Sequence, residues 1–585
     1  MKRIIALILA LVMTMALVAC GGDKPTSSAP GNPSTPSNPS TPSNPSTPSN
    51  PGTSTPAAPA DPDADKYGGD LIIGSGNATN TMDMHYNTST LGNLQWSLHV
   101  YEGLAVLDAN GKIYSLLADY EESPDGLKYT YTLKKGVKFS NGDEVTMEDV
   151  EASIRRGWAA GITTEASFNK MWATATVTFT DTQFIVEFPE YNVNYASTFH
   201  SPGSSYRIMP KEICEKYPVT GGTTAANGIT WGGELTTLIG EIEDVIGTGP
   251  YVLTKWTDNA DVVLTRNEHY VPVTEGNEDA IGVAAPRKAY CDTITFSYNG
   301  DAASRTAATM AHEYQIGSVQ NAMVDAALAL GIERGDAGTT WTHGIFFNLD
   351  ESNADSPIAD VNVRKAIRAC LDVNAIMLAI VSGDQERVNL DPYAVTKDTV
   401  YASTKMEDSG EWNVADKELA KQYLAQSSYN GEPIVYLVHS SGNFYNAAMA
   451  IVPQLEEIGL NIELMVVDNG SHSALRKDPA TGHDIGCWEV QKREDNPVLH
   501  STFVTGTQGW WSSDAKDAAL NVMRHTPTGS AESIAAYEDY LDAVIDECPY
   551  ILFGHPTGVT YNWPEVERNQ KGQVNYYYWN SYFVD

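Results

Sequence analysis

The segment from residue 21 to about residue 66 limits the fold to the part of the chain that follows it. The hexamer Asn-Pro-Ser-Thr-Pro-Ser begins at Asn32, Asn38 and Asn44, and apart from proline no apolar side chain larger than alanine occurs before Tyr67. Such a composition buries too little apolar area to offset the entropy lost on folding. Its frequent prolines favour extended conformations instead. We therefore expect a disordered Pro/Ser/Thr/Asn linker at 21–66, with packed structure only after it.

The first 20 residues have the layout of a secretory signal. Lys2 and Arg3 precede an uncharged, largely apolar run from Ile4 to Ala19, which is short for a membrane-spanning helix. The run ends in Leu17-Val18-Ala19-Cys20, which resembles a bacterial lipobox, the motif whose cysteine is lipidated and becomes the new N-terminus. An ordinary signal that ends near a cysteine is the alternative. With 1–20 as a lipoprotein signal peptide, lipidated Cys20 would anchor the mature chain on the extracellular side of the cytoplasmic membrane, at the cell surface or in the periplasm.

Length and charge exclude several classes of protein. The chain has 585 residues, too many for one core, so two or three packed units are expected. Its formal charge of -37 at pH 7 disfavours nucleic acid and anionic lipid as partners, because both carry the same sign. No second long apolar run follows residue 20, so the mature chain is not expected to span the membrane.

The thiols after Cys20 do not form a metal or redox motif. They are Cys214, Cys291, Cys370, Cys487 and Cys548. An odd number cannot pair completely, and the spacings are too wide for a CxxC site. We expect buried free thiols, and leave open a disulfide between two of them. No metal and no cofactor are expected.

Strand and helix patterns are mixed along the rest of the chain without a fixed period, which indicates an α/β protein. Strands are expected at Leu71–Gly74, Tyr129–Leu133 with a continuation through Lys134–Phe139 to a turn at Ser140–Asp143, Tyr251–Lys255, Val262–Arg266, Ile434–Val438 and Asn461–Val467. Helical spacing is found at Leu91–Leu107, Val363–Ile380 and Asp416–Gln426, and in a helix that runs through Leu455. A further helix starts at the cap formed by Thr146 and Asp149, and places Val150, Ile154 and Trp158 on one face.

Several sequence blocks occur in a fixed order between residues 68 and about 560. They include Gly68-Gly69-Asp70-Leu71, Met82-Asp83-Met84-His85, Tyr101-Glu102-Gly103-Leu104, Ser123–Thr130, Leu133–Gly142, Val145–Val150, Gly247–Tyr251, Phe347-Asn348, Val363–Ile367, Gln454–Leu460 and Cys548–Ile551. In this order the blocks resemble the family 5 extracytoplasmic solute-binding proteins, which serve oligopeptide, dipeptide and nickel ABC importers. Most of the matching residues suit structural roles. Arg364, for example, is expected to pair with an acid such as Asp360.

The resemblance implies a bilobed α/β fold of the periplasmic-binding-protein type (class II, cluster C), with an extra subdomain inserted in the first lobe. The expected limits are 67–113 and 245–342 for lobe I, 114–244 for the inserted subdomain, 343–554 for lobe II and 555–585 for a C-terminal return to lobe I.

The resemblance also suggests ligand contacts. In this family the loop after the first strand lines the cleft, which brings His85, Tyr86 and Asn93 into consideration. Trp488 corresponds to a position that packs on the ligand, where an indole offers a rigid face and one donor. The alternative for Trp488 is a core residue.

Gln491 departs from the family pattern. Peptide-binding members carry an aspartate three residues after this tryptophan, and that aspartate holds the α-ammonium group of the peptide. A neutral glutamine leaves room for another amine, a sugar or a metal chelate as ligand. Glu489, Glu494 and Asp495 are the acids that could take over the role.

The function expected from these observations is that of a monomeric binding protein, which captures a small solute, an oligopeptide or dipeptide, and delivers it to an ABC permease in the membrane. Closure of the two lobes around the ligand would provide the signal. A peptide-sensing receptor on the same fold is an alternative. An enzyme is not expected, because the sequence lacks HExxH, GxSxG and GxxxxGK motifs.

Overall fold

The computed structural model describes residues 63–86, 91–108, 111–160, 172–204, 206–274, 276–338, 341–395, 399–491, 496–499, 509–568 and 577–584. From Asp61 to Asp585 the chain forms one compact unit. The predicted signal peptide with Cys20, and nearly all of the predicted linker, lie outside the described residues. Within these ranges, the apolar stretches of the helices are too short for any of them to cross a bilayer.

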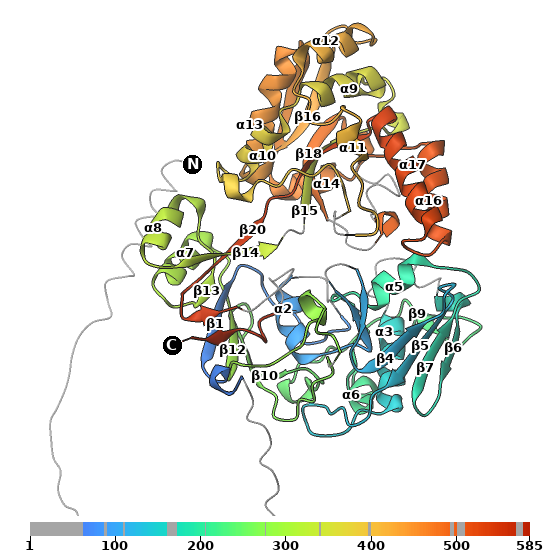
Figure 1. The fold of residues 1–585 in the computed structure, drawn as a ribbon, viewed down its shortest axis with the longest axis vertical. Coiled ribbons are helices and arrows are strands. Elements are labelled where there is room, and N and C mark those ends of the chain that lie inside the picture. The colour runs from blue at the N-terminus through green and yellow to red at the C-terminus, as the bar shows by residue number, and fades with distance from the viewer. Residues whose placement is uncertain are drawn as a thin grey trace, which may run out of the picture. The chain divides into compact units, whose positions relative to one another are not determined.

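A seven-stranded mixed sheet organises the first half of this unit, in the order β10-β11-β12-β1-β13-β20-β14 (Figure 1). Its strands are β1 (Asp70–Ser75), β10 (Tyr251–Trp256), β11 (Asp261–Arg266), β12 (Thr293–Tyr298), β13 (Ile316–Gly317), β14 (Glu333–Gly338) and β20 (Gly558–Asn562). β1 runs parallel to β12 and β13, and the other pairs are antiparallel. Leu71 and Ile73 of β1 are buried, as alternation along a strand predicts.

A second, four-stranded antiparallel sheet, in the order β4-β5-β7-β6, belongs to the same half. Its strands are β4 (Ala118–Glu122), β5 (Lys128–Leu133), β6 (Thr176–Phe179) and β7 (Gln183–Glu187). The helices of this half are α2 (Leu91–Val100), α3 (Met147–Ala160), α5 (Val193–Phe199), α6 (Lys211–Lys216), α7 (Ala302–Met310) and α8 (Val324–Ala329). Short ladders are β2 (Ala105–Leu107) with β3 (Ile113–Ser115), β8 (Thr223–Thr224) with β9 (Thr230–Trp231), and β21 (Val566–Glu567) with β22 (Tyr582–Phe583). One continuous hydrophobic core runs from β1 through α2 and α3 to β7.

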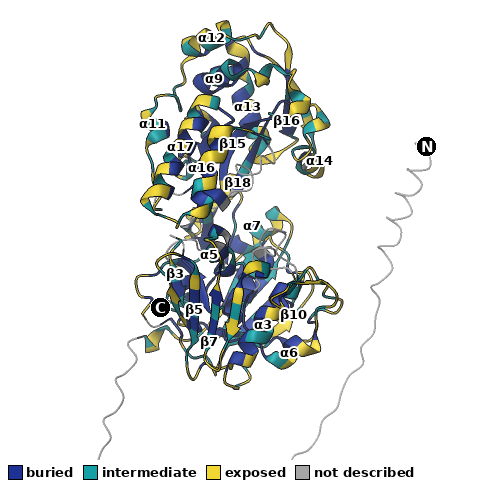
Figure 2. Ribbon diagram, turned by 90° about the vertical axis from the view of Figure 1, so that its right-hand side faces the viewer, coloured by how far each residue is buried: buried dark blue, intermediate teal, exposed yellow. Residues whose placement is uncertain are grey.

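A five-stranded sheet in the order β17-β16-β18-β15-β19 organises the second half. Its strands are β15 (Trp341–Phe347), β16 (Pro433–His439), β17 (Asn461–Val467), β18 (Ile485–Gln491) and β19 (Tyr550–Gly554). Its helices are α9 (Val361–Cys370), α10 (Val373–Ile380), α11 (Lys405–Asp408), α12 (Lys417–Ala425), α13 (Gly442–Glu457), α14 (Asn469–Leu475), α16 (Asp514–His525) and α17 (Ala531–Glu547). Two separate cores form, one with α9, α10 and α13 and the other with α16 and α17. Figure 2 shows buried residues along the central strands and exposed ones on outward helix faces.

The chain passes between the two large sheets twice. It leaves the first after β14 and enters the second at β15, and it returns between β19 and β20. At the return, Gly554 has a φ of +141°, and a Cβ atom there would lie 2.1 Å from the carbonyl oxygen of Asn389. Only glycine fits this close approach of two backbones.

Several predicted elements are confirmed. The strands expected at Leu71–Gly74, Tyr129–Leu133 and Asn461–Val467 are β1, β5 and β17. The α3 cap is also confirmed, because the Thr146 hydroxyl donates to Asp149 at 2.6 Å and the backbone N–H of Thr146 donates to the same carboxylate at 2.8 Å. All five predicted thiols are buried and free.

Other predicted helix and strand boundaries were wrong. The helix expected over Leu91–Leu107 ends at Val100, and Ala105–Leu107 forms a strand instead. β5 stops at Leu133, so only the turn of the predicted hairpin is present, closed by a single bridge between Lys138 and Glu144. The helix expected over Val363–Ile380 is broken into α9 and α10, because Asp372 caps a new helix by accepting from the N–H of Ala375.

Arg364 does not form the predicted ion pair with Asp360. Its guanidinium donates to the carbonyls of Ile358 and Ala359 at 2.8 and 2.9 Å, and to those of Glu547 and Cys548 at the end of α17. Asp360 instead caps α9 through the N–H of Asn362. The arginine therefore ties α9 to α17 by satisfying orphan carbonyls at a helix end.

Replacement of Arg364 by methionine should lower the free energy of unfolding by about 3 kcal/mol, because four carbonyls lose a charged donor. Urea unfolding measures the change. Lys365→Met on the same helix is the control and should stay within about 0.5 kcal/mol of the unmodified protein. Equal stability of the two variants would contradict this role of Arg364.

Candidate ligand-binding site

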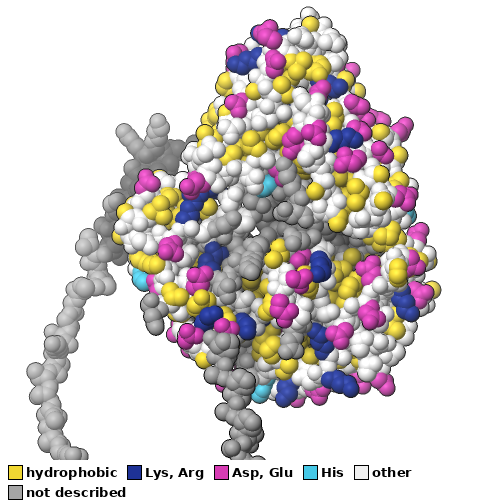
Figure 3. All heavy atoms as spheres, viewed as in Figure 1, with side chains coloured by type: hydrophobic (Ala, Val, Ile, Leu, Met, Phe, Trp, Pro, Cys, Tyr) yellow, Lys and Arg dark blue, Asp and Glu magenta, His cyan; other side chains and the backbone are white. Residues whose placement is uncertain are grey.

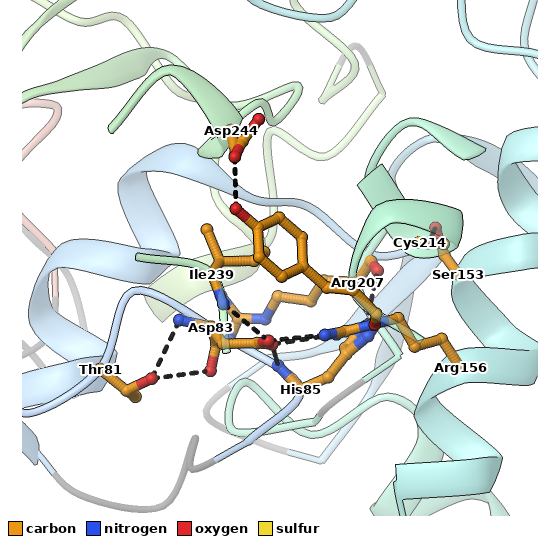
Figure 4. Close-up of polar contacts among 10 residues, drawn as sticks. Thr81, Asp83, His85, Ser153, Arg156, Arg207, Cys214, Ile239 and Asp244 are labelled. Carbon is orange, nitrogen blue, oxygen red and sulfur yellow. Dashed lines mark hydrogen bonds and ion pairs between the residues drawn. The ribbon is translucent and has the colours of Figure 1, made fainter. Parts of the chain in front are cut away.

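The loop after β1 is held by a buried ion pair (Figure 4). Arg156 of α3 donates from Nη1 to Asp83 Oδ1 at 2.9 Å and from Nη2 to Oδ2 at 2.6 Å. The same carboxylate accepts the N–H groups of His85 and Ile239, at 3.0 and 3.3 Å. Burial acts to raise the pKa of Asp83, but the hydrogen bonds and charge of Arg156 outweigh it and hold this pKa below its ordinary value.

The network extends beyond Asp83. Arg156 Nε donates to the carbonyl of Tyr217 at 2.8 Å, and the Tyr217 hydroxyl donates to Asp244. The Asp83 carboxylate thereby joins the loop after β1, α3 and the segment at Ile239, and Arg156 links Tyr217 to them. The loop that carries His85 and Tyr86 is fixed in position by this arrangement.

The three predicted contacts from this half are not equally accessible. His85 is fully buried, with Nε2 at 3.4 Å from the carbonyl oxygen of Arg207, and Asn93 is buried and exchanges hydrogen bonds with Asn80 at 2.7 and 3.1 Å. Tyr86 is 48% exposed. His85 and Asn93 support the loop in this structure, while Tyr86 presents its ring outward. Their ligand contacts stay predictions.

In the second half, Trp488 of β18 is buried. Its ring stacks on Phe346 of β15, with centroids 4.7 Å apart and planes at 6°, and the His472 ring lies 6.4 Å away. Beyond it, the Phe444 ring lies 5.6 Å from His343 and 6.1 Å from His472. Aromatic and imidazole rings from β15, α13, α14 and β18 therefore meet at this part of the sheet.

Several buried polar atoms in this part of the second half are unpaired within the described residues. The buried atoms that have no hydrogen-bond partner among the described residues include Thr342 Oγ1, His343 Nδ1, His472 Nε2, Arg476 Nε and Trp488 Nε1. Buried polar groups are almost always paired, so a group of exceptions needs an explanation, such as a ligand or ordered water. We call these five residues the lobe II polar cluster, in which Thr342 and Trp488 project from one face of the sheet and His343 from the other.

Glu489 lies at the rim of the lobe II polar cluster. It is directly opposite His343 in the β15–β18 register, with its Oε2 at 3.7 Å from His343 Nε2, and its side chain is 38% exposed. Burial raises the pKa of Glu489, and the nearby charge of Arg476 acts in the opposite direction. A partly exposed carboxylate beside buried donors can accept a cationic group from a ligand.

The remaining predicted residues give less information. Gln491 pairs with Trp341 in the strand register, but its side chain, like all of Glu494 and Asp495, lies outside the described part of the structure.

Three residues of the site, His343, His472 and Arg476, were not predicted from the sequence. His343 lies in β15, His472 lies in α14 and Arg476 directly follows α14, and no sequence motif connects them. Nowhere in the described ranges do three or more His, Cys, Asp or Glu side chains gather as a metal site would require.

The fold and the sequence were compared with known proteins. Of the solved structures, the ABC transporter substrate binding protein CtaP from Listeria monocytogenes superposes with a TM-score of 0.69 at 19% identity, covering 89% of this chain and 100% of CtaP. NikA from Brucella suis, in complex with Fe(III)-EDTA, superposes with a TM-score of 0.68 at 18% identity, covering 88% and 100%. These overlays confirm the predicted bilobed α/β fold of a solute-binding protein.

The sequence comparison identifies the family. The profile of the bacterial extracellular solute-binding proteins, family 5 Middle, matches residues 112–520. Oligopeptide-binding protein AppA from Bacillus subtilis is 21% identical over 519 residues, which are 84% of this chain and 86% of AppA. The chain belongs to the family 5 extracellular solute-binding proteins, as predicted from its sequence blocks.

The buried His85 predicts a loss of stability in acid. Burial lowers its pKa to about 3, whereas histidine in an unfolded chain titrates near 6.5. Below pH 6.5 the unfolded chain therefore binds a proton that the folded protein does not, and stability falls as the pH drops toward 3. His85→Gln should reduce this slope by about 1.4 kcal/mol per pH unit between pH 4 and 6.

Urea unfolding at a series of pH values measures the slope. His525→Gln is the control, because His525 is exposed and should leave the slope unchanged. An unaltered slope in His85→Gln would show that the ring is protonated in the folded protein.

Proposed function

We propose that this protein captures a small extracellular peptide between its two halves, with the peptide α-ammonium group held by Glu489, and delivers it to the permease of an ABC importer. The observation that carries the proposal is the position of Glu489 beside the lobe II polar cluster. The family resemblance implies that peptide-binding members carry the ammonium-binding aspartate at the position of Gln491. Glu489 is two residues earlier on the same strand and points to the same face, since side chains alternate along β18.

The chemistry of the cluster fits a peptide N-terminus. Arg476 presents a buried N–H without a partner among the described residues and Glu489 presents a carboxylate, whereas Trp488 projects from the opposite face of β18. A ligand with one cationic amine and neighbouring carbonyl oxygens satisfies both kinds of group. AppA from Bacillus subtilis, named as an oligopeptide-binding protein, supports the peptide class, and one of its structures holds a nonapeptide.

Closure of the two halves would follow from ligand contacts with both. Some of the contacts that closure needs are present: the hydroxyls of Tyr191 and Thr528 lie 3.2 Å apart, and Val193 of α5 packs in the same core as Trp488. A ligand that touches both halves favours the closed state over the open one. The permease would then recognise that state.

A non-peptide solute is the second candidate. Its support is the neutral Gln491 together with solved relatives that hold other ligands, NikA with Fe(III)-EDTA and AgaA with agropinic acid.

We further propose that the protein binds its solute without chemical change, as a monomer. Figure 3 shows acidic side chains spread over the visible face among basic ones, without a continuous patch of one sign.

Glu489→Gln should weaken binding of a free oligopeptide by about 10- to 100-fold, because a charge-assisted hydrogen bond is lost. Isothermal calorimetry with a peptide pool and its N-acetylated counterpart measures the change. Acetylation should weaken binding to the unmodified protein by a similar factor and have little effect on the variant. Glu463→Gln, an exposed glutamate on β17, should bind like the unmodified protein.

Trp488→Phe keeps the stacked ring and removes only the indole donor. It should give a smaller loss of affinity than Glu489→Gln, and should retain the preference for a free N-terminus. Equal binding of free and acetylated peptides by the unmodified protein would refute the ammonium site. Binding of a chelate or sugar, with no peptide bound, would replace the peptide with the second candidate.

The lipobox-like sequence supports a lipid anchor on Cys20. In cells fed radiolabelled palmitate, the chain should carry label and sediment with membranes, and Cys20→Ser should lose the label. One acyl chain holds a protein only weakly, so stable sedimentation indicates more than one chain. A labelled Cys20→Ser protein would contradict the assignment.

A further inference from the structure

A small cavity in the first half is lined by a buried arginine that has no counter-charge in contact with it. Arg207 is 4% exposed, and its Nη1 and Nη2 atoms have no hydrogen-bond partner in the described part of the chain. The cavity has a volume of about 20 Å³, enough for one particle of the size of a water molecule or a chloride ion. Arg207, Arg287, Glu102, Ser201 and Ser204 are among its lining residues.

Glu102, the acid that lines the cavity together with Arg207, does not neutralise it. Glu102 is buried, with one carboxylate oxygen bonded to Arg287 Nη1 at 2.5 Å and the other to the hydroxyl of Thr248 at 3.0 Å. The charges of Arg287 and Glu102 therefore neutralise each other, and the positive charge of Arg207 is not neutralised. Asp83 does not compensate for it either, because both of its oxygens are bonded to Arg156.

Arg207 stays charged at neutral pH although it is buried. Burial lowers its pKa to about 9, and the neighbouring charge of Arg287 adds to the effect. The guanidinium is still protonated at neutral pH. A buried charge without a partner costs far more free energy than a buried neutral group, so a counter-ion in the cavity relieves a large penalty.

The other polar groups in the cavity can also donate. Ser201 Oγ accepts the N–H of Gly203 at 3.2 Å, and Ser204 Oγ accepts that of Tyr206 at 3.1 Å. The hydroxyl hydrogens of both serines have no acceptor among the described residues. A site with a guanidinium and two hydroxyl donors is suited to an anion and not to a cation.

We propose that this cavity binds a monovalent inorganic anion of the size of chloride, held by the Arg207 guanidinium and the hydroxyls of Ser201 and Ser204. The anion is a structural ligand of the first half and is separate from the solute captured by the protein. It stabilises the folded state only, because the site does not exist in the unfolded chain.

Thermal unfolding of the full chain tests the proposal, with sodium gluconate replaced stepwise by sodium chloride at constant ionic strength. Gluconate is too large for the cavity. The midpoint of the unmodified protein should rise by about 1 to 2 °C for each tenfold increase in chloride above its dissociation constant. Arg207→Met should abolish the dependence, and in gluconate it should be as stable as the unmodified protein or more so, because it removes an unpaired charge.

Arg155→Gln is the matched control. Arg155 lies beside Arg156 on α3, is 46% exposed and pairs with Glu151, so the variant should keep the full chloride dependence. A second measurement needs no variant: crystals grown in sodium bromide should show an anomalous scattering peak beside the Arg207 guanidinium. Equal chloride dependence in Arg207→Met, or ordered water without bromide at this position, would overturn the proposal.

Discussion

The buried pair between Asp83 and Arg156 is the interaction on which the first half depends. Asp83 is fully buried, and its carboxylate receives two bonds from the guanidinium and two from backbone N–H groups. All of its acceptor capacity is therefore used, which is the condition under which a buried ion pair is tolerated. Because the partners come from the loop after β1, from α3 and from the segment at Ile239, the pair fixes three parts of the chain that hydrophobic packing alone would leave free to slide.

Some polar groups in the rest of the interior follow the same rule, and two groups that do not are of particular interest. Arg364 and Glu102 are buried and bonded throughout. The lobe II polar cluster and Arg207 are buried with atoms that are left unbonded within the described residues. Proteins break local rules of this kind mainly where something else binds, and the two exceptions differ in the way that their ligands should differ. The lobe II polar cluster combines donors with the carboxylate of Glu489 beside aromatic rings. The cavity at Arg207 offers donors in a space for a single small ion.

Local signals in the sequence predicted the elements that depend on neighbouring residues. The cap formed by Thr146 and Asp149, the alternation in β1 and the buried face of α3 could all be derived without the structure. The end of α2 was misjudged because Tyr101 and Leu104 continue the apolar spacing into an extended segment. Trp488 and Glu489 were within reach through a family resemblance. His343, His472 and Arg476 were not, because long-range strand pairing and the placement of α14 bring them together, and neither leaves a pattern along the chain.

The two passages between the sheets have a mechanical consequence. β14 is paired with β20 on one side of the passages, and β15 is paired with β19 on the other. Two connections constrain the relative motion of the halves more than one connection would, because each fixes a further point of one half relative to the other. A doubly tethered pair of halves has fewer relative orientations to choose from than a singly tethered pair, and less orientational entropy is then lost when the halves are held together.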